Sequence, residues 1–290
     1  MSGLVAVPFN INLSLKSLID QHLPADLSAG CVFRPVEGLS SESWHISAGD
    51  HQWLARLSSS EKQLLGIDRR REYKLLRHLA PTGIAPLVKC WAAPWLVVNW
   101  VEGETLAQQA FFDVTSQQRL AEMLVSLHNA RPTGERLVIK QRFEIYWQSI
   151  DRKRLTPAWL RLHKRMLKAA LPKTVKISLA HMDIHPQNWI NSPHGARLID
   201  WEYAIATDIA LEFAALFACN GYDAEQQKSS LEYYVQSGGY RDGDLLARGV
   251  GEWQPWLDYL MLLWFEVRWQ QTGDARYTEW AQPLRVKLFS

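Results

Sequence analysis

The chain has 290 residues, of which 47% are hydrophobic, and its 32 basic and 30 acidic residues leave a net charge of only +2. Enough apolar material is therefore present for a packed core, and so small a net charge argues against nucleic acid or a membrane surface as a partner. Three widely spaced cysteines and an N-terminus without a signal-peptide pattern predict a cytoplasmic protein without disulfides. No obligate protein partner is evident, so any ligand must be recognised locally.

Residues 1–100 are expected to form a small β-rich lobe. Segments rich in aromatic and β-branched residues, bounded by turn-forming residues, predict strands at 31–37, 43–49, 51–57, 87–92 and 95–101. Between the third and fourth of these, apolar residues at helical spacing predict one main helix at 68–80. The short basic run Arg69–Arg71 in that helix is expected to be a solvated face rather than a nucleic-acid contact.

Residues 101–290 are expected to form a larger, mostly helical lobe, which makes the predicted fold a bilobal α+β one. Helical spacing predicts helices at 119–130, 158–171, 208–218, 224–236 and 252–271. Thr115 and Gln118 form a capping-box pattern before the first, and Thr156 with Pro157 a cap and first turn for the second. A single island of strand and turn, Ile177–Trp201, interrupts the helices.

That island contains "HMDIHPQN" at 181–188, which suits two chemistries. On an extended strand, His181, Asp183 and His185 would project to one face and could hold a zinc ion. The proline that follows His185 favours a loop over a strand. Elsewhere the histidines fall singly, so this metallohydrolase hypothesis is the weaker one.

A phosphotransferase explains more of the neighbourhood. Asp183 and Asn188 lie five positions apart, and the apolar strand pattern "ARLID" then delivers Asp200. Transfer of a phosphoryl group to an alcohol needs one carboxylate to orient the hydroxyl and a few oxygen ligands for Mg²⁺, the rest being phosphates and water. One Asp, one Asn and one further Asp meet that need.

"LAHMDIHPQNWI", "LIDWEYA", "DIALE" and "WFEVRWQQTGD" resemble the aminoglycoside phosphotransferase and choline kinase superfamily and, within it, the bacterial thiamine kinases. The resemblance implies a protein-kinase-like fold. It makes Asp183 the catalytic base, Asn188 and Asp200 the Mg²⁺ ligands, and His181 a residue that braces the loop. An aspartate with an ordinary pKa of about 3.9 would be ionised at neutral pH and could accept a hydrogen bond from the alcohol.

The resemblance also places ATP between the lobes. Gly38 and Ser40 lie where a phosphate-covering loop is expected, although the segment is poor in glycine. Arg56 occupies the position of the strand lysine of kinases, with Glu72 as its expected ion-pair partner. The adenine should meet backbone groups of the hinge, Val98–Trp100.

The acceptor is expected on the other side of the phosphates. Glu202 follows Asp200 by two residues, so both carboxylates would face one side if the strand continued. A cationic acceptor such as thiamine suits carboxylates and aromatic faces. The expected substrate residues are Glu202, Trp201, Tyr203, Trp264 and Glu266, with Trp147 and Trp269 also considered.

The resulting expectation is a Mg²⁺-dependent kinase that moves the γ-phosphate of ATP to the hydroxyethyl alcohol of thiamine, giving thiamine monophosphate in vitamin salvage. Charge alone does not separate thiamine from choline or an aminoglycoside, so a kinase for another small alcohol stays open. A nucleotide-binding pseudokinase also stays open, because of the glycine-poor loop and Arg56.

Overall fold

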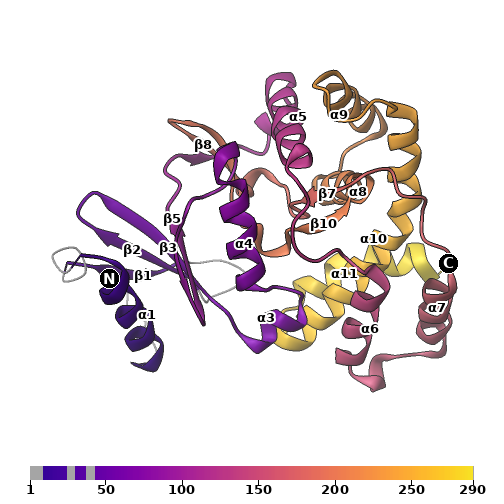
Figure 1. Cartoon of the computed structure of the whole chain (residues 1–290). Helices are drawn as coiled ribbons and strands as arrows, with labels where there is room; N and C mark the ends of the chain where they lie inside the picture. Colours follow the sequence, from indigo (N-terminus) through magenta and orange to yellow (C-terminus); the bar gives the residue numbers. More distant parts are fainter. Residues whose placement is uncertain (1–8, 25–29, 37–42, 290) are drawn as a thin grey trace.

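The computed structural model describes residues 9–24, 30–36 and 43–289. It begins with helix α1 (Phe9–His22), which an antiparallel sheet follows (Figure 1). The sheet has five strands in the order β1-β2-β3-β5-β4. Their bounds are β1 Val32–Pro35, β2 Ser43–Ala48, β3 His51–Leu57, β4 Val88–Ala92 and β5 Trp95–Asn99. All five predicted strands are therefore confirmed, with ends that differ by one or two residues.

Helices cover both faces of this sheet. Side chains alternate along β3, so Trp53 and Ala55 pack with α1 (Phe9–His22), while Leu54 packs with the larger core on the opposite face, where α4 (Arg69–Leu79) lies. The predicted main helix is thus confirmed. Asp68 caps it, accepting hydrogen bonds from the backbone N–H groups of its first turn. A short helix α3 (Ser60–Leu64) and a 3₁₀ turn η1 (Ala80–Thr82) flank α4.

The remainder is mostly helical, as predicted, and packs on the far side of α4 (Figure 1). Its helices are α5 Val114–Asn129, α6 Ile139–Ser149, α7 Pro157–Lys168, α8 Ile209–Asn220, α9 Ala224–Gln236, α10 Gly243–Thr272 and α11 Arg276–Phe289. Its strands are β6 Glu104–Thr105, β7 Ile177–Ala180, β8 Trp189–Ser192, β9 Gly195–Leu198 and β10 Ile205–Asp208. Short 3₁₀ turns are η2 Ala110–Phe112, η3 Arg152–Arg154, η4 Pro186–Asn188 and η5 Trp201–Tyr203.

Two predicted caps have different outcomes. Thr156 caps α7 through a hydrogen bond from the Trp159 N–H, with Pro157 in the first turn, as the sequence predicts. The capping box at Thr115 is wrong, because α5 already begins at Val114 and its N-cap is Asp113. Because the helix begins two residues earlier than predicted, the Thr115 side chain lies inside the first turn.

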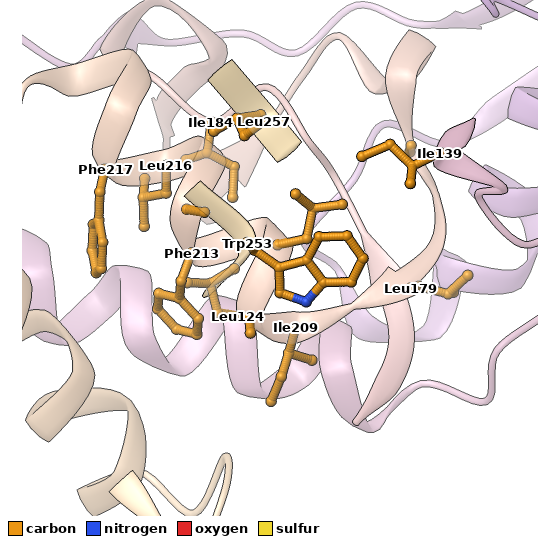
Figure 2. Packing of buried hydrophobic residues seen from close by; sticks show 14 of the residues in the cluster. Leu124, Ile139, Leu179, Ile184, Ile209, Phe213, Leu216, Phe217, Trp253 and Leu257 are labelled. Atoms are coloured by element: carbon orange, nitrogen blue, oxygen red, sulfur yellow. The ribbon is translucent and has the colours of Figure 1, made fainter. Parts of the chain in front are cut away.

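One large core holds the helical part together and reaches across to α4. Figure 2 shows Trp253 of α10 among residues of α5, α8 and the segment Ile177–Trp201. Leu124, Phe213 and Leu179 are examples from these three parts. Leu75, Leu76 and Leu79 of α4 belong to the same cluster of buried residues. The apolar face of α4 therefore fixes the sheet against the helical part, which sets the distance between residues carried by the two.

Within the described ranges no helix combines the length and apolarity that a membrane crossing requires. The five-stranded sheet ends at Asn99, next to the predicted lobe boundary. The division into lobes at 1–100 and 101–290 stays a prediction.

Candidate active site

The loop after β7 carries the opening motif and is braced from two sides. His181 is fully buried and donates from Nε2 to the carbonyl of Ile199 at 2.9 Å, with its ring against Trp201. Met182 adopts a left-handed backbone conformation, with a φ of 66°, and its N–H points to the buried carboxylate of Glu212 on α8. These contacts hold the loop in a backbone shape that a non-glycine residue rarely adopts. The His181 contact agrees with the bracing role predicted for it.

Asp183 and Asn188 lie against each other within this loop. The Asn188 amide donates from Nδ2 to the backbone carbonyl of Asp183 at 2.9 Å and to its carboxylate at 3.2 Å. Both bonds use the amide nitrogen, which leaves the amide oxygen of Asn188 as a ligand for a cation. About a third of the Asp183 side chain, 31%, remains exposed to solvent.

Asp200 reaches the same place from a strained turn. β9 ends at Leu198, and Asp200 has a φ of 62° before the 3₁₀ turn η5. The strand therefore does not continue through Glu202, and the two carboxylates are not strand neighbours on one face. The left-handed conformation costs free energy in a non-glycine residue and is typical of functional sites.

The environments of the two aspartates push their pKa values apart. Burial, followed by the negative charges of Asp200 and Glu202, raises the pKa of Asp183 to about 7 despite the hydrogen bond from Asn188. Burial also opposes ionisation of Asp200, but the charge and hydrogen bond of Arg56 outweigh it and lower the pKa of Asp200. The expectation that Asp183 has an ordinary pKa is therefore wrong for the ligand-free site. A bound cation would favour the ionised form again.

Arg56 of β3 joins the two parts of the site. Its guanidinium donates to Glu72 of α4 at 2.7 Å, to Glu202 at 2.8 Å and to Asp200. The predicted pairing of Arg56 with Glu72 is thus present. Burial alone would lower the pKa of Arg56, but the three carboxylates raise it, so this side chain stays charged. Arg56 thus pairs with the carboxylate that is expected to bind Mg²⁺.

The donor set fits Mg²⁺. The cation prefers oxygen ligands and usually takes only one or two carboxylates from the protein, the remaining positions going to water and phosphate. Asp200 supplies a carboxylate whose pKa is lowered and whose side chain is 37% exposed, and Asn188 supplies an amide oxygen. A metal held mainly by substrate phosphates needs no more than this.

The zinc hypothesis finds no support in the same loop. The described part of the chain contains no group of three or more His, Cys, Asp or Glu side chains arranged to hold a metal ion. His181 already donates to a backbone carbonyl, and His185 pairs through Nδ1 with Gln187. His181, Asp183 and His185 therefore do not form a zinc triad, because β7 ends at Ala180 and the left-handed conformation of Met182 breaks the extended strand that the triad would need.

The predicted nucleotide residues are only partly described. Gly38 and Ser40 lie outside the described residues. Val98 is buried in β5, opposite Leu54 of β3, and Trp100 follows the strand with 38% of its surface exposed. The Trp100 ring packs edge-on against His45, with the centroids 4.7 Å apart. Val98 and His45 lie on the same side of the sheet as Arg56. The contacts expected for the base and for the phosphates would therefore lie on one face of the sheet.

Three of the predicted acceptor residues are occupied elsewhere. Trp201 is 1% exposed and donates its indole N–H to the Leu198 carbonyl, so it belongs to the core and leaves no surface for a substrate. Glu266 is buried under Arg154 and Arg285. Glu202 is held by arginines from the sheet side of the site. The arginines that hold Glu202 and Glu266 come from distant segments, whereas Trp201 donates within its own turn.

Tyr203 and Trp264 remain the better acceptor candidates. Both are half-buried, and the Trp264 indole donates to the Tyr203 hydroxyl at 3.1 Å. Burial and the nearby negative charge of Glu202 raise the pKa of Tyr203, to which Asp183 also contributes, so the phenol lies within electrostatic reach of the catalytic loop. Trp147 instead stacks on His163, and Trp269 lies beneath Arg154.

Two site residues were not predicted in these roles. Arg69 is fully buried, donating to Glu72 at 2.6 Å and to Glu202 at 3.0 Å, so the expectation of a solvated face is wrong for it. Its i,i+3 spacing from Glu72 was the available signal. Glu212 lies in the "DIALE" segment, and burial raises its pKa to about 8 despite backbone hydrogen bonds from the loop.

Sequence comparison agrees with this geometry. Residues 32–249 match the phosphotransferase enzyme family. The chain belongs to that family. It is 38% identical over 207 residues to thiamine kinase of Escherichia coli K12, which covers 71% of this chain and 72% of the relative. The thiamine kinase of Shigella dysenteriae is equally similar, with the same identity and coverage.

Solved structures of similar fold include several small-alcohol kinases. Choline kinase of Streptococcus pneumoniae superposes with a TM-score of 0.76 at 19% identity, covering 97% of this chain and 99% of that one. Ethanolamine kinase of Plasmodium vivax gives 0.71 at 15% identity, with 94% and 86% covered. A macrolide 2'-phosphotransferase of Brachybacterium faecium gives 0.60 at 18%, with 93% and 97% covered. The predicted protein-kinase-like bilobal fold is therefore confirmed.

Proposed function

We propose that this phosphotransferase is a thiamine kinase, which transfers the γ-phosphate of ATP to the hydroxyethyl alcohol of thiamine and forms thiamine monophosphate for vitamin salvage. One observation carries the proposal: Asp183, Asn188 and Asp200 lie together beside Arg56 in a chain that is 38% identical to thiamine kinases. The fold neighbours alone would favour choline or ethanolamine, but identities below 25% bear only on the fold.

Asp183 would act on the acceptor alcohol. A carboxylate within hydrogen-bond reach of the hydroxyl orients it for in-line attack and takes its proton late in a loose transition state. The hydrogen bond from Asn188 fixes the rotamer of the carboxylate. The braced backbone that immediately precedes Asp183, at His181 and Met182, keeps the carboxylate from turning away.

Asp200 and Asn188 would hold Mg²⁺, which neutralises charge on the phosphates of ATP when bound. Arg56 would contact phosphate oxygens, and Glu72 keeps its guanidinium aimed at the cleft. Nucleotide binding then requires Arg56 to exchange Asp200 for phosphate. Gly38, Ser40, Val98 and Trp100 complete the proposed ATP site.

Tyr203 and Trp264 would receive the cationic thiazolium ring, because aromatic faces attract cations and these two remain half-exposed. We place the reaction in the cytoplasm. Neither Cys90 nor Cys219 forms a disulfide, in keeping with a reducing compartment.

The test is an ATP-consumption assay on purified protein with Mg²⁺ and, in parallel, thiamine, choline, kanamycin or no acceptor. Thiamine-dependent ADP release, together with thiamine monophosphate identified by phosphorus NMR, is the expected result. Release that depends only on choline or kanamycin would keep the reaction class and overturn the substrate. Nucleotide binding without transfer to any of the three would favour the pseudokinase.

A further inference from the structure

Arg69, the first residue of α4, connects three parts of the molecule through one buried guanidinium. Its Nε donates to the carbonyl of Leu57 at the end of β3, at 3.3 Å. Its Nη1 donates to Glu72 on α4 at 2.6 Å, and its Nη2 to Glu202 in η5 at 3.0 Å. None of the side chain is exposed. Arg69 therefore links β3, α4 and the turn η5 through hydrogen bonds.

These contacts close a ring of four charged side chains. Arg56 binds Glu72 and Glu202, and Arg69 binds the same two carboxylates from the other side. Asp200 lies outside the ring and contacts only Arg56 of the two arginines. The group holds three carboxylates against two guanidiniums, so each cation carries more than one negative partner.

Binding of a nucleotide would change the partners of Arg56 but not those of Arg69. Under the proposed function, on which this inference rests, Arg56 must leave Asp200 for phosphate. The Arg69 contact with Glu202 is enclosed, with side-chain exposures of 0% and 10%, so it faces no ligand. We propose that Arg69 is a positioning residue, which keeps Glu202 and the neighbouring Asp200 docked against α4 while Arg56 changes partners.

Loss of Arg69 would leave Arg56 alone with three carboxylates. Arg56 would then be held more strongly by them and released less readily to phosphate, and Asp200 would lose the anchor two residues away. Both effects weaken binding of the magnesium nucleotide. Tyr203, although next to Glu202, keeps its own hydrogen bond from Trp264 of α10, so binding of the acceptor should change less. The expected signature is a change in nucleotide affinity and KM for ATP without a matching change in KM for thiamine.

The experiment measures the Kd of the non-hydrolysable analogue adenylyl imidodiphosphate with Mg²⁺ by calorimetry. The variants are Arg69→Gln, Glu202→Gln and the double variant, with Arg70→Gln as the control, because Arg70 is the next residue along and is exposed. Arg69→Gln is expected to raise Kd by about tenfold, the cost of one charge-assisted hydrogen bond. In the Glu202→Gln background the same change should raise Kd by less than about twofold, since the two residues act as a pair.

Wild-type affinity in Arg69→Gln would overturn the positioning role, and so would an equal loss with and without Glu202. A lowered Tm with unchanged Kd would assign Arg69 a purely structural part and would also overturn it. Should Arg69→Gln fail to fold, Arg69→Lys is measured by the same criteria, because one ammonium keeps the charge without the fork that spans two carboxylates. If the wild-type protein binds the nucleotide but does not phosphorylate thiamine, only the assignment of thiamine as the substrate is overturned. If the wild-type protein does not bind the nucleotide, both proposals are overturned.

Discussion

Replacement of Asp183 by asparagine is expected to abolish most turnover and, at the same time, to stabilise the ligand-free protein. The folded chain holds this carboxyl with a pKa of about 7, against an ordinary value of 3.8. As pH rises between those values, the unfolded chain releases the proton while the folded chain keeps it. Stability therefore falls with pH across this window and levels off above it. Asparagine, which does not titrate, removes that loss.

The size of the stabilisation follows from the pKa shift of Asp183 and from the exposed fraction of its side chain. Each pH unit inside the window costs about 1.4 kcal/mol, which sums to about 4 kcal/mol at pH 8 as an upper bound. Because 31% of the side chain is exposed, solvent screening reduces this to about 2–3 kcal/mol. For a chain of this length that corresponds to a rise in Tm of about 4–6 °C.

The assay compares thermal unfolding of Asp183→Asn and wild type in EDTA without nucleotide, at about pH 5 and about pH 8. The stabilisation should be larger at the higher pH by about 1.5–2 kcal/mol, since about two thirds of the window lies above pH 5. Asp50→Asn, at an exposed carboxylate in the turn between β2 and β3, is the control and should change neither value. Equal Tm values for Asp183→Asn and wild type at both pH values would refute the raised pKa.

The catalytic half is measured on the same proteins. Loss of a general base lowers kcat by about 10²–10⁴-fold, while binding of ATP should be nearly unchanged. Turnover close to wild type in Asp183→Asn would refute the assignment of the base, whatever the Tm.

Three further changes probe other parts of the site. Asp200→Ala should abolish the Mg²⁺ dependence of nucleotide binding in calorimetry, and a Mg²⁺ dependence equal to wild type would remove it from the metal site. Trp201→Phe should leave the KM for thiamine unchanged and lower the free energy of unfolding by about 1–2 kcal/mol, because the indole hydrogen bond is lost. Trp264→Ala should instead raise the KM for thiamine. The opposite pattern would make Trp201 the substrate residue and Trp264 the core residue. His181→Ala should lower the free energy of unfolding by about 2–4 kcal/mol in urea, because a buried ring and its bond to Ile199 are lost, and an unchanged denaturation midpoint would contradict the bracing role.

The sequence by itself determined most of the elements and the catalytic loop. Strand alternation and helical spacing are local, so the five strands of the sheet and the helix α4 could be predicted, whereas α1, α3, α6 and α11 were not predicted. The spacing of Asp183 and Asn188 is also local, and their hydrogen bond joins residues only five positions apart. Resemblance to known phosphotransferases placed Arg56 opposite Glu72, a pairing that the structure contains.

Only the tertiary structure decided how the charges and rings around that loop are partnered. Glu202 meets Arg69 across 133 positions and Arg56 across 146, distances over which a single sequence carries no pairing signal. A tryptophan is equally suited to filling the core and to lining a pocket, so the residue type alone could not decide between these two positions for Trp201. A buried guanidinium is tolerated only where carboxylates surround it. Glu72 meets Arg69 within α4, but Glu202 meets it only when the helical part packs against α4.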